Sequence, residues 1–477
     1  MNMPINLTHK AATFAYDLDF TNLPADVLTV ARRCVLDGLA VALAGSEQPA
    51  FDILHRHLKG FGGSPQARVI GDTNSSLPAH HAALLNGLAG HAMDWDDTQL
   101  AESPGRVYGL LTHPTIPVLS AALAIADMLD GVDGEAFLTA FISGFEVECK
   151  VAEAINPDHY VKGFHTSGTI GTLGAAVCAS KLLTLDTTGI SRAIGIAASL
   201  ASGIRANFGT MTKPLHVGRA AENGVTAALL AKEGFTANEE ALDGQWGYLA
   251  VAGRGGNPEL VADRFGNPFS IVSPGVSIKP YPCGVLTHPS MDTMVTLMRD
   301  HDLTHTQIKK VRLYAGSNIL GPIRYKVATN ALEGKFCMPF LLSAIIIAGK
   351  AGKSEFTDAF VQSQVVQGMQ RKIETLLDPD IESLGFDRIR SRIEVETSDG
   401  RILAHEADEN YRGGPHNPLS NAEVENKFRD CAAGLLNEER CQRLFDVVWN
   451  LEKQTDVTEI LALLDWRRPR EQPKGVR

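Results

Sequence analysis

The chain has 477 residues, of which 44% are hydrophobic, so it is long enough to bury two cores and we expect two domains. Its formal net charge of -11 argues against a nucleic-acid or anionic-membrane surface, because binding to phosphate groups depends on positive charge. We therefore expect no nucleic-acid partner and no membrane, and any anion site must be local.

Cysteine usage and the first residues both bear on location. The seven cysteines are scattered singly, without a C-x-x-C pair, which is typical of a reducing cytosol. Residues 1–7 lack the basic segment and apolar run of a secretory signal, and no stretch approaches the length of a membrane span. The sequence predicts a cytoplasmic protein.

The first part of the chain is rich in Ala and Gly and predicts a helical bundle domain over residues 1–274. Pro117 falls in the first turn of one predicted helix, while Gly45 and Gly234 stop two others, as expected for start and stop residues. The predicted helices span residues 23–44, 115–129, 134–154, 168–183 and 218–232.

Small residues recur at spacings of three in one of these helices, at Gly168, Gly171 and Gly174. A phosphate-binding loop would instead need G-x-G-x-x-G after a strand. We interpret the glycines as sites of close helix packing and expect no nucleotide cofactor.

The pattern changes after Pro274, where a smaller α+β domain is predicted over residues 275–415. Alternating apolar positions predict a strand at 308–315, and residues 391–397 and 401–406 flank Ser398-Asp399-Gly400, a turn sequence typical of a hairpin. An amphipathic pattern after residue 420 predicts a C-terminal helical segment, 416–477, that returns to the helical domain. The expected fold is mainly α with a smaller α+β domain.

Three carboxylates and a hydroxyl cluster near the end of the helical stretch at 82–93: Asp94, Asp96, Asp97 and Thr98. Like charges this close should raise at least one carboxyl pKa. The cluster is either an acid/base loop that orients a substrate or a solvated turn that caps a helix, and the motif alone leaves both open.

A metal site is another interpretation of this acidic cluster. An aspartate-rich motif in a helical protein is also a feature of magnesium-dependent isoprenoid synthases, but those need a second, facing cluster, which the sequence lacks. The sequence has no H-E-x-x-H motif for binding zinc, and His80 and His81 are adjacent rather than on one helical face. We expect no metal.

Two histidines open predicted helices, where free backbone N–H groups attract anions. His113 precedes Pro114, and His165 is followed by Thr166 and Ser167. Single histidines are usually ordinary surface or core residues, but two at helix starts beside hydroxyl donors favour a functional role.

A local cationic cluster surrounds the start of the helix predicted after Val217. Lys213 and His216 lie immediately before it, with Arg205 nearby, and Lys279 adds a cation from the second domain. This is either a carboxylate-binding cluster or ordinary surface charge. Nucleophilic catalysis is not expected, because no Ser occupies a G-x-S-x-G turn and Cys283 has no thiolate signature.

The order of five segments resembles the MmgE/PrpD superfamily from about residue 23 to about residue 428. These segments are H-A-M-D-W-D-D-T, T-H-P, G-F-H-T-S-G-T-I-G-T-L-G-A-A, N-F-G-T-M-T-K-P-L-H-V-G and K-P-Y-P-C-G. The superfamily includes 2-methylcitrate dehydratase, cis-aconitate decarboxylase and iminodisuccinate epimerase. The resemblance implies a cofactor-free, homodimeric enzyme whose active site lies between a helical domain and a smaller lid domain.

The resemblance also implies roles for individual residues. Those it makes catalytic are Asp94, His113, His165, Lys213 and Lys279, and those it makes substrate-binding are Thr98, Asp97, Arg205 and His216.

One position departs from the family pattern. Members of the dehydratase and decarboxylase type usually carry a tyrosine where this chain has Phe340, which cannot donate a hydrogen bond. The departure leaves room for an epimerase. The stretch 99–111, with Glu102, Arg106 and Tyr108, is a candidate for a replacement contact.

These observations together predict a cofactor-independent lyase of the dehydratase or decarboxylase type. It would act on a small di- or tricarboxylic acid by proton transfer next to a carboxylate. An epimerase or isomerase using the same proton abstraction is the alternative, and a catalytically inactive binding protein is a more remote one.

Overall fold

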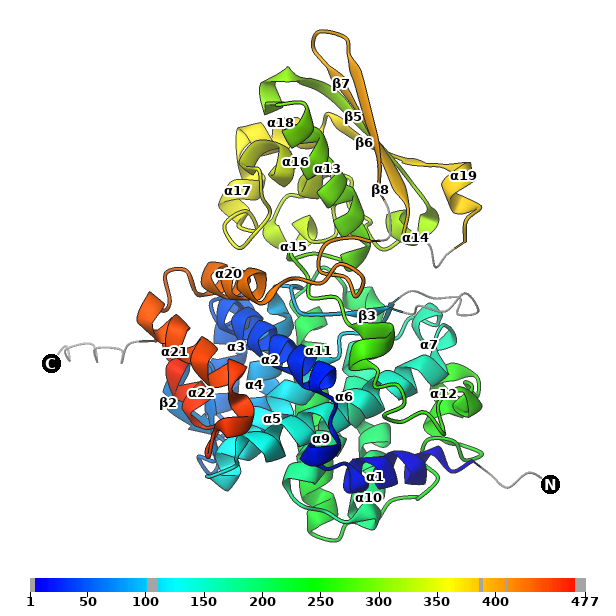
Figure 1. Cartoon of the computed structure of the whole chain (residues 1–477), viewed down its shortest axis with the longest axis vertical. Helices are drawn as coiled ribbons and strands as arrows, with labels where there is room; N and C mark the ends of the chain where they lie inside the picture. Colours follow the sequence, from blue (N-terminus) through cyan, green and yellow to red (C-terminus); the bar gives the residue numbers. More distant parts are fainter. Residues whose placement is uncertain (1–4, 101–109, 386–388, 408–409, 468–477) are drawn as a thin grey trace, which may run out of the picture.

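The computed structural model describes residues 5–100, 110–385, 389–407 and 410–467. Figure 1 shows a larger helical body below a smaller body built on a twisted sheet. The predicted fold class, mainly α with a smaller α+β part, is confirmed. Among the described residues no helix is long and apolar enough to cross a membrane.

The larger body contains twelve α-helices and two short antiparallel strand pairs among its described residues. The helices are α1 (Leu7–Asp17), α2 (Ala25–Gly45), α3 (Pro49–Lys59), α4 (Ala79–Ala92), α5 (Thr115–Leu129), α6 (Gly134–Ile155), α7 (Asp158–Val161), α8 (Thr166–Thr169), α9 (Gly171–Leu182), α10 (Thr187–Leu200), α11 (Thr212–Lys232) and α12 (Tyr248–Gly253). The strands are β1 (Ala67–Val69) with β2 (Asp72–Leu77), and β3 (Gln99–Leu100) with β4 (Leu110–Thr112).

Most predicted helices of this body are found, with two corrections. The helix predicted at 168–183 is divided into α8 and α9, with Ile170 between them. The helix predicted from residue 218 begins at Thr212, so Lys213 and His216 lie inside it rather than before it. The earlier start is possible because Pro214 occupies the first turn, where a helix needs no backbone N–H donor.

Small side chains let the central helices of the larger body approach closely. Helix α4 contacts α2, α5 and α11, and α11 also contacts α9. At the contact of α2 with α4, a Cβ added at Gly45 would lie 1.8 Å from the backbone oxygen of Ala89. Only glycine fits there, because that distance is far inside van der Waals contact.

The smaller body is a four-stranded mixed sheet in the order β6-β5-β7-β8. Its strands are β5 (Ile308–Ala315), β6 (Ile373–Leu377), β7 (Ser391–Thr397) and β8 (Ile402–Ala407), and only the β5–β6 pair is parallel. Its helices are α13 (His288–Asp300), α14 (Ser317–Leu320), α15 (Ala331–Gly334), α16 (Met338–Ala348), α17 (Asp358–Gln362), α18 (Gln364–Gln370) and α19 (Pro379–Glu382).

The strand and hairpin predictions for this body are confirmed. Strand β5 has the predicted bounds, and its register shifts between Ile308 and Lys310, which accounts for the broken alternation there. Strands β7 and β8 form the predicted antiparallel hairpin, and residues of β7 alternate between buried and partly buried. Helices α13 and α16 contact the sheet and bury its inner face.

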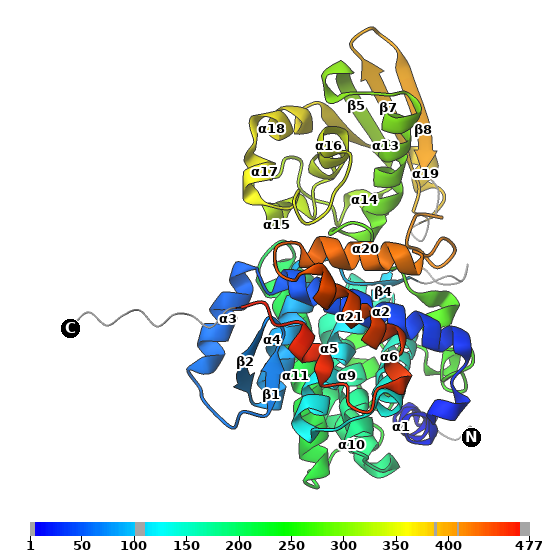
Figure 2. The same cartoon turned by 60° about the vertical axis from the view of Figure 1, so that its left-hand side comes forward.

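The last helices, α20 (Asn421–Ala432), α21 (Glu438–Trp449) and α22 (Glu459–Leu463), lie against the larger body rather than the sheet (Figure 2). Helix α20 contacts α2, where buried Lys427 forms an ion pair with buried Asp37 at 2.5 Å. The domain boundaries at residues 274 and 415 remain a proposal.

The close contact of α2 with α4 predicts the effect of a single methyl group. Gly45→Ala should lower the free energy of unfolding by about 2 kcal/mol or more, because two central helices must separate to accommodate it. Urea unfolding followed by circular dichroism measures the change. The control is Gly368→Ala in α18, where an added Cβ meets no atom within 4 Å, so unfolding free energy should stay constant or rise. Equal stability of the two variants would contradict the packing described here.

Candidate active site

The acidic segment after α4 is buried rather than solvated. Asp94, Asp96, Asp97 and Thr98 are each at most 3% exposed, so the interpretation as a solvated turn is wrong. Helix α4 ends at Ala92, and Asp94 takes a left-handed backbone conformation with φ of 53°, which Asp tolerates better than most residues.

Thr98 ties this segment to the linker that carries Lys279. Its backbone N–H donates to the oxygen of Ser277 at 3.0 Å, and the N–H of Ser277 donates back at 2.7 Å. Two residues beyond Ser277, the Lys279 side chain reaches the segment from the other direction. Sequence positions about 180 residues apart are thereby held together.

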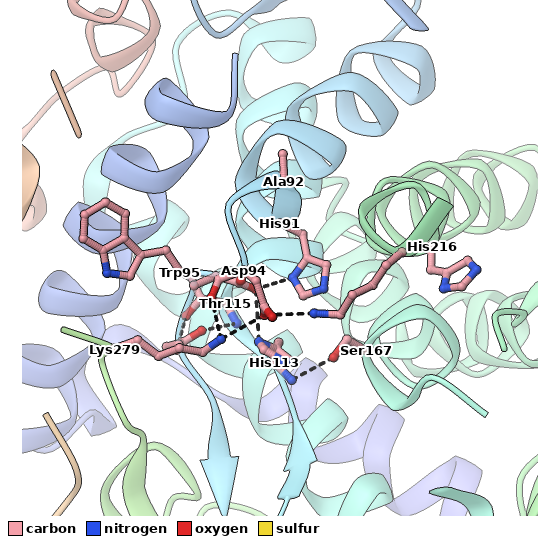
Figure 3. A network of polar contacts seen from close by, with 12 residues as sticks. His91, Ala92, Asp94, Trp95, His113, Thr115, Ser167, His216 and Lys279 are labelled. Atoms are coloured by element: carbon pink, nitrogen blue, oxygen red, sulfur yellow. Dashed lines mark hydrogen bonds and ion pairs between the residues drawn. The ribbon is translucent and has the colours of Figure 1, made fainter. Parts of the chain in front are cut away.

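Three buried lysines donate to backbone oxygens within this segment. Lys335 Nζ donates to Ala92 at 2.6 Å, Lys279 Nζ to Asp94 at 2.8 Å, and Lys427 Nζ to Trp95 at 2.8 Å. All three lysines follow residue 275 and come from different elements. We call Ala92 to Thr98 with these three lysines the lysine-clamped turn; Figure 3 shows Lys279 reaching it beside Asp94 and Trp95.

The Asp94 carboxylate is shared by two ammonium groups. Its Oδ1 lies 2.8 Å from Lys213 Nζ and 3.0 Å from Lys279 Nζ. Burial by itself would raise the pKa of Asp94, but the two lysines outweigh burial and hold that pKa well below its usual value. Among the groups that line the cavity, two lysines stand beside one ionised carboxylate, and this local arrangement suits an anionic ligand.

Histidines surround Asp96 on the other side of the turn. His91 Nδ1 lies 2.8 Å from Asp96 Oδ2, and His113 Nδ1 lies 3.3 Å from the same oxygen. Burial lowers the pKa of His91 to about 3 and lowers that of His113. Both rings are neutral at pH 7, and His91 donates from Nδ1 because a carboxylate accepts there.

His165 lines the cavity and contacts a second histidine, His216. Its Nδ1 lies 3.1 Å from His216 Nδ1, while its Nε2 has no hydrogen-bond partner among the described residues. Burial is the main reason that its pKa lies well below the usual value. A neutral imidazole with a free nitrogen can accept or donate one proton, depending on its tautomer.

A cavity lies between the two bodies beside these groups. The second body contributes apolar residues to it, whereas the helical body and Lys279 contribute its polar groups. The lining residues are Asp94, Thr98, Thr112, His113, Tyr160, His165, Thr166, Ser167, Phe208, Lys213, Lys279, Gly284, Val285, Leu286, Pro322, Ile323 and Phe336.

The structure brings six of the nine predicted site residues to this cavity: Asp94, Thr98, His113, His165, Lys213 and Lys279. The other three lie behind the lining. His216 contacts His165, Arg205 lies over the ring of Tyr160 at 3.6 Å from its centroid, and Asp97 accepts from the hydroxyl of Thr115 at 2.7 Å.

Several lining or supporting residues were not predicted. Tyr160 and Thr112 line the cavity, and Lys335 clamps the turn from behind. Thr112 stands next to His113 in the T-H-P motif and could have been found there, whereas Tyr160 and Lys335 give no local signal in the sequence.

The position of Phe340 differs from the expectation attached to it. Its ring is fully buried and packs edge-on against Phe356 and Phe360, and it does not line the cavity. The lining aromatic residue of this segment is Phe336. The proposed replacement contacts Glu102, Arg106 and Tyr108 lie outside the described residues.

Two groups of described residues have ligand atoms close enough together to hold a cation. One is His91, Asp94, Asp96 and His113 in the site, and the other is His80, His81 and Glu222 at the contact of α4 with α11. In the first group a divalent cation would compete for Asp94 with two ammonium groups already within 3.0 Å. The charge arrangement therefore favours an organic anion over a metal, and the expected absence of a cofactor remains a prediction.

The cavity combines two lysine ammonium groups with neutral imidazoles, an arrangement that suits proton transfer on a carboxylic acid. The chain matches the MmgE/PrpD N-terminal domain over residues 9–261 and the MmgE/PrpD C-terminal domain over residues 281–453. It belongs to the MmgE/PrpD family. Residue 274, the predicted end of the first helical part, lies in the gap between the two matches.

The chain is also similar along its whole length to individual members of the family. It is 28% identical to the cis-aconitate decarboxylase of Homo sapiens, over 98% of this chain and 96% of that protein. It is 27% identical to the cis-aconitate decarboxylase of Mus musculus, over 96% and 93% of the two chains. The cis-aconitate decarboxylase of Aspergillus terreus is 26% identical, over 97% of each chain.

The buried carboxyl of Asp97 generates a pH-dependent prediction. Burial is the largest cause that raises its pKa to about 7, above the unfolded value near 3.9. Folded protein therefore binds more protons than unfolded protein between about pH 4 and pH 7, and Asp97 lowers stability as pH rises through that window. The difference in free energy of unfolding between the neutral variant Asp97→Asn and wild type should therefore shift in favour of the variant by about 2–3 kcal/mol when the pH is raised from 5 to 8.

Urea unfolding of both proteins at the two pH values measures this difference. Asp133→Asn, at the exposed N-cap of α6, controls for the loss of one negative charge, because Asn also caps helices. A difference between Asp97→Asn and wild type that does not change with pH would show that Asp97 is not a perturbed acid.

Proposed function

We propose that this protein is a cofactor-independent lyase, of the dehydratase or decarboxylase type, that acts on a small di- or tricarboxylic acid. The observation that carries the proposal is the pairing of Lys213 and Lys279 with a single buried carboxylate, Asp94, at the wall of the cavity. Similarity to three cis-aconitate decarboxylases supports the same class of substrate.

In this proposal the two lysines bind the substrate carboxylate and stabilise the charge that grows on it. In a dehydration, a base takes the proton from the carbon next to the carboxylate, the electron pair of that C–H bond passes through the carboxylate-stabilised anion into a new C=C bond, and hydroxide leaves the neighbouring carbon and takes up a proton to become water. In a decarboxylation, the bond to one carboxyl group breaks and carbon dioxide leaves, the electron pair stays on the carbon and is delocalised toward a second carboxylate, and a proton then adds to that carbon. In both routes negative charge grows on the carboxylate that the ammonium groups hold.

Proton transfer is assigned to the histidines of the cavity. His113 and His165 line it, and burial keeps both neutral near pH 7, so either ring can take a proton and return one. Asp94 positions the lysines rather than acting as a base, because its pKa is held well below the usual value.

An epimerase or isomerase is the second candidate. The observation in its favour is the presence of two imidazoles at one cavity: a neutral ring would remove a proton from one face, and the other ring, in its protonated form, would return a proton to the opposite face. A binding protein without activity is a more remote third candidate.

The three candidates are separated by incubation in deuterated water followed by nuclear magnetic resonance. Cis-aconitate, 2-methylcitrate and iminodisuccinate are suitable probes. A changed alkene signal indicates a lyase, and solvent deuterium in recovered, inverted substrate indicates an epimerase. Binding of every probe without either change would favour the inactive protein.

Removal of one of the two ammonium groups at Asp94 should abolish most of the activity. Lys213→Ala is expected to lower kcat/KM by at least about 10²-fold, because it removes a donor that interacts most strongly with developing charge. Lys232→Ala, at the exposed C-terminal end of the same helix, is the matched control and should keep wild-type kinetics. Unchanged turnover in Lys213→Ala would contradict the proposed role of Lys213 in binding the substrate carboxylate and stabilising its charge.

The family resemblance further supports a homodimer in the cytoplasm, which we include in the proposal. Light scattering after gel filtration should give twice the chain mass of 51.3 kDa. The seven cysteines are all free and buried, in agreement with a reducing compartment. A monomeric mass would contradict the homodimer, and recovery of the protein from a membrane or secreted fraction would contradict the cytoplasmic location.

A further inference from the structure

A buried carboxyl group contacts the cavity lining from behind. Glu148, on α6, is 0% exposed, and its Oε1 lies 2.6 Å from Oγ1 of Thr112, which lines the cavity. Glu148 Oε2 has no hydrogen-bond partner among the described residues. One hydrogen bond therefore connects a group in the protein core to the site.

The surroundings of Glu148 favour its neutral form. Burial raises its pKa well above the usual value, the Thr112 contact offsets this only in part, and the nearby Asp97 raises it further. The nearest lysine on the same helix, Lys150, is directed to Glu146 and to the backbone oxygen of Pro268. An ionised carboxylate at this place would be a buried charge without a cation, which is costly.

A neutral carboxyl group must place its proton on one of two oxygens. Oε2 lies against Gly174 of α9, where an added Cβ would be 2.9 Å from it and 2.9 Å from the backbone oxygen of Gly144, and Oε2 has no hydrogen-bond partner among the described residues. Oε1 is within hydrogen-bond distance of the Thr112 hydroxyl. With the proton on Oε1, Glu148 donates to the Thr112 hydroxyl and Thr112 accepts.

This direction decides what Thr112 offers to a ligand. A threonine hydroxyl has one proton, and if that proton pointed to an ionised Glu148, only lone pairs would face the cavity. When Glu148 donates instead, the Thr112 proton is free to be donated into the cavity. We infer that Glu148 and Thr112 form a neutral donor pair that binds a carboxylate oxygen of the substrate.

The inference rests on the proposed function, since it assigns a further carboxylate contact to the same cavity. Thr112 would touch the substrate, and Glu148 would be a positioning residue that orients the hydroxyl. The pair adds a donor without adding charge, in contrast to Lys213 and Lys279. It would therefore favour acids with a carboxylate at this point over analogues that present a donor group there.

The test uses tricarballylate, a tricarboxylate without a double bond, as a binding probe in calorimetry, together with kinetics on cis-aconitate. Glu148→Gln keeps a neutral N–H donor toward Thr112, so its Kd and KM should stay within about twofold of wild type. Glu148→Met keeps the length but removes the donor, and Thr112→Val removes the hydroxyl. Each should weaken Kd and raise KM by roughly tenfold or more, as expected for a lost hydrogen bond to a charged group.

The double variant Thr112→Val/Glu148→Met should be no weaker than Thr112→Val, because Glu148 acts only through the hydroxyl. A purely structural role would instead lower the unfolding midpoint of Glu148→Met without this pattern. Equal weakening by Glu148→Gln and Glu148→Met, or full binding by Thr112→Val, would overturn the donor pair.

Infrared difference spectra of wild type minus Glu148→Gln at neutral pH give a readout that needs no ligand. The expected result is the stretching band of a protonated carboxyl group, and its absence would overturn the inference whatever the enzyme binds. If that band is present but wild-type protein neither binds tricarballylate nor changes cis-aconitate, the proposed function fails and the assigned ligand fails with it.

Discussion

Burial of negative charge in the lysine-clamped turn is the constraint on which the rest of the site depends. Asp94 and Asp96 are almost fully enclosed, and an enclosed carboxylate is stable only with charged or hydrogen-bonding partners. Lys213 and Lys279 supply those partners at Asp94, and further lysines hold the backbone oxygens on either side. The fold must therefore deliver cations from distant parts of the chain to one turn.

The groups that neutralise the carboxylates of this turn also line the cavity. Lys213 and Lys279, which pair with Asp94, both line the cavity, and Asp94 is the single carboxylate among the lining residues. The histidines beside them lose their own charge to burial. A chain with a net charge of -11 thus presents a local cationic surface to a small acid, while apolar residues of the second body, such as Ile323 and Phe336, line the remaining wall.

The sequence predicted those features that depend on local patterns. Helix α5 and strand β5 were predicted with their bounds, because a proline in a first turn and an alternating apolar pattern are local signals. Lys213 and Asp94 were identified because they lie in distinctive motifs.

Features that depend on contacts between distant segments could not be predicted. Lys335 lies more than 240 positions from its acceptor, and no motif marks it. Asp97 and Arg205 belong to the predicted motifs, but whether a side chain reaches the cavity or lies behind it depends on the packing of neighbours such as Thr115 and Tyr160. Phe340 shows the same limitation, since alignment with a family position does not determine where its ring points.

The origin of the clamping lysines has a consequence for how such proteins can diverge. The turn is encoded before residue 100, whereas Lys279, Lys335 and Lys427 are all encoded after residue 275. A recombinant protein that joined the N-terminal part of one family member to the C-terminal part of another would combine a turn with lysines that had evolved beside a different turn. The two halves are thus expected to be inherited together, as one unit of selection, despite their separate folds.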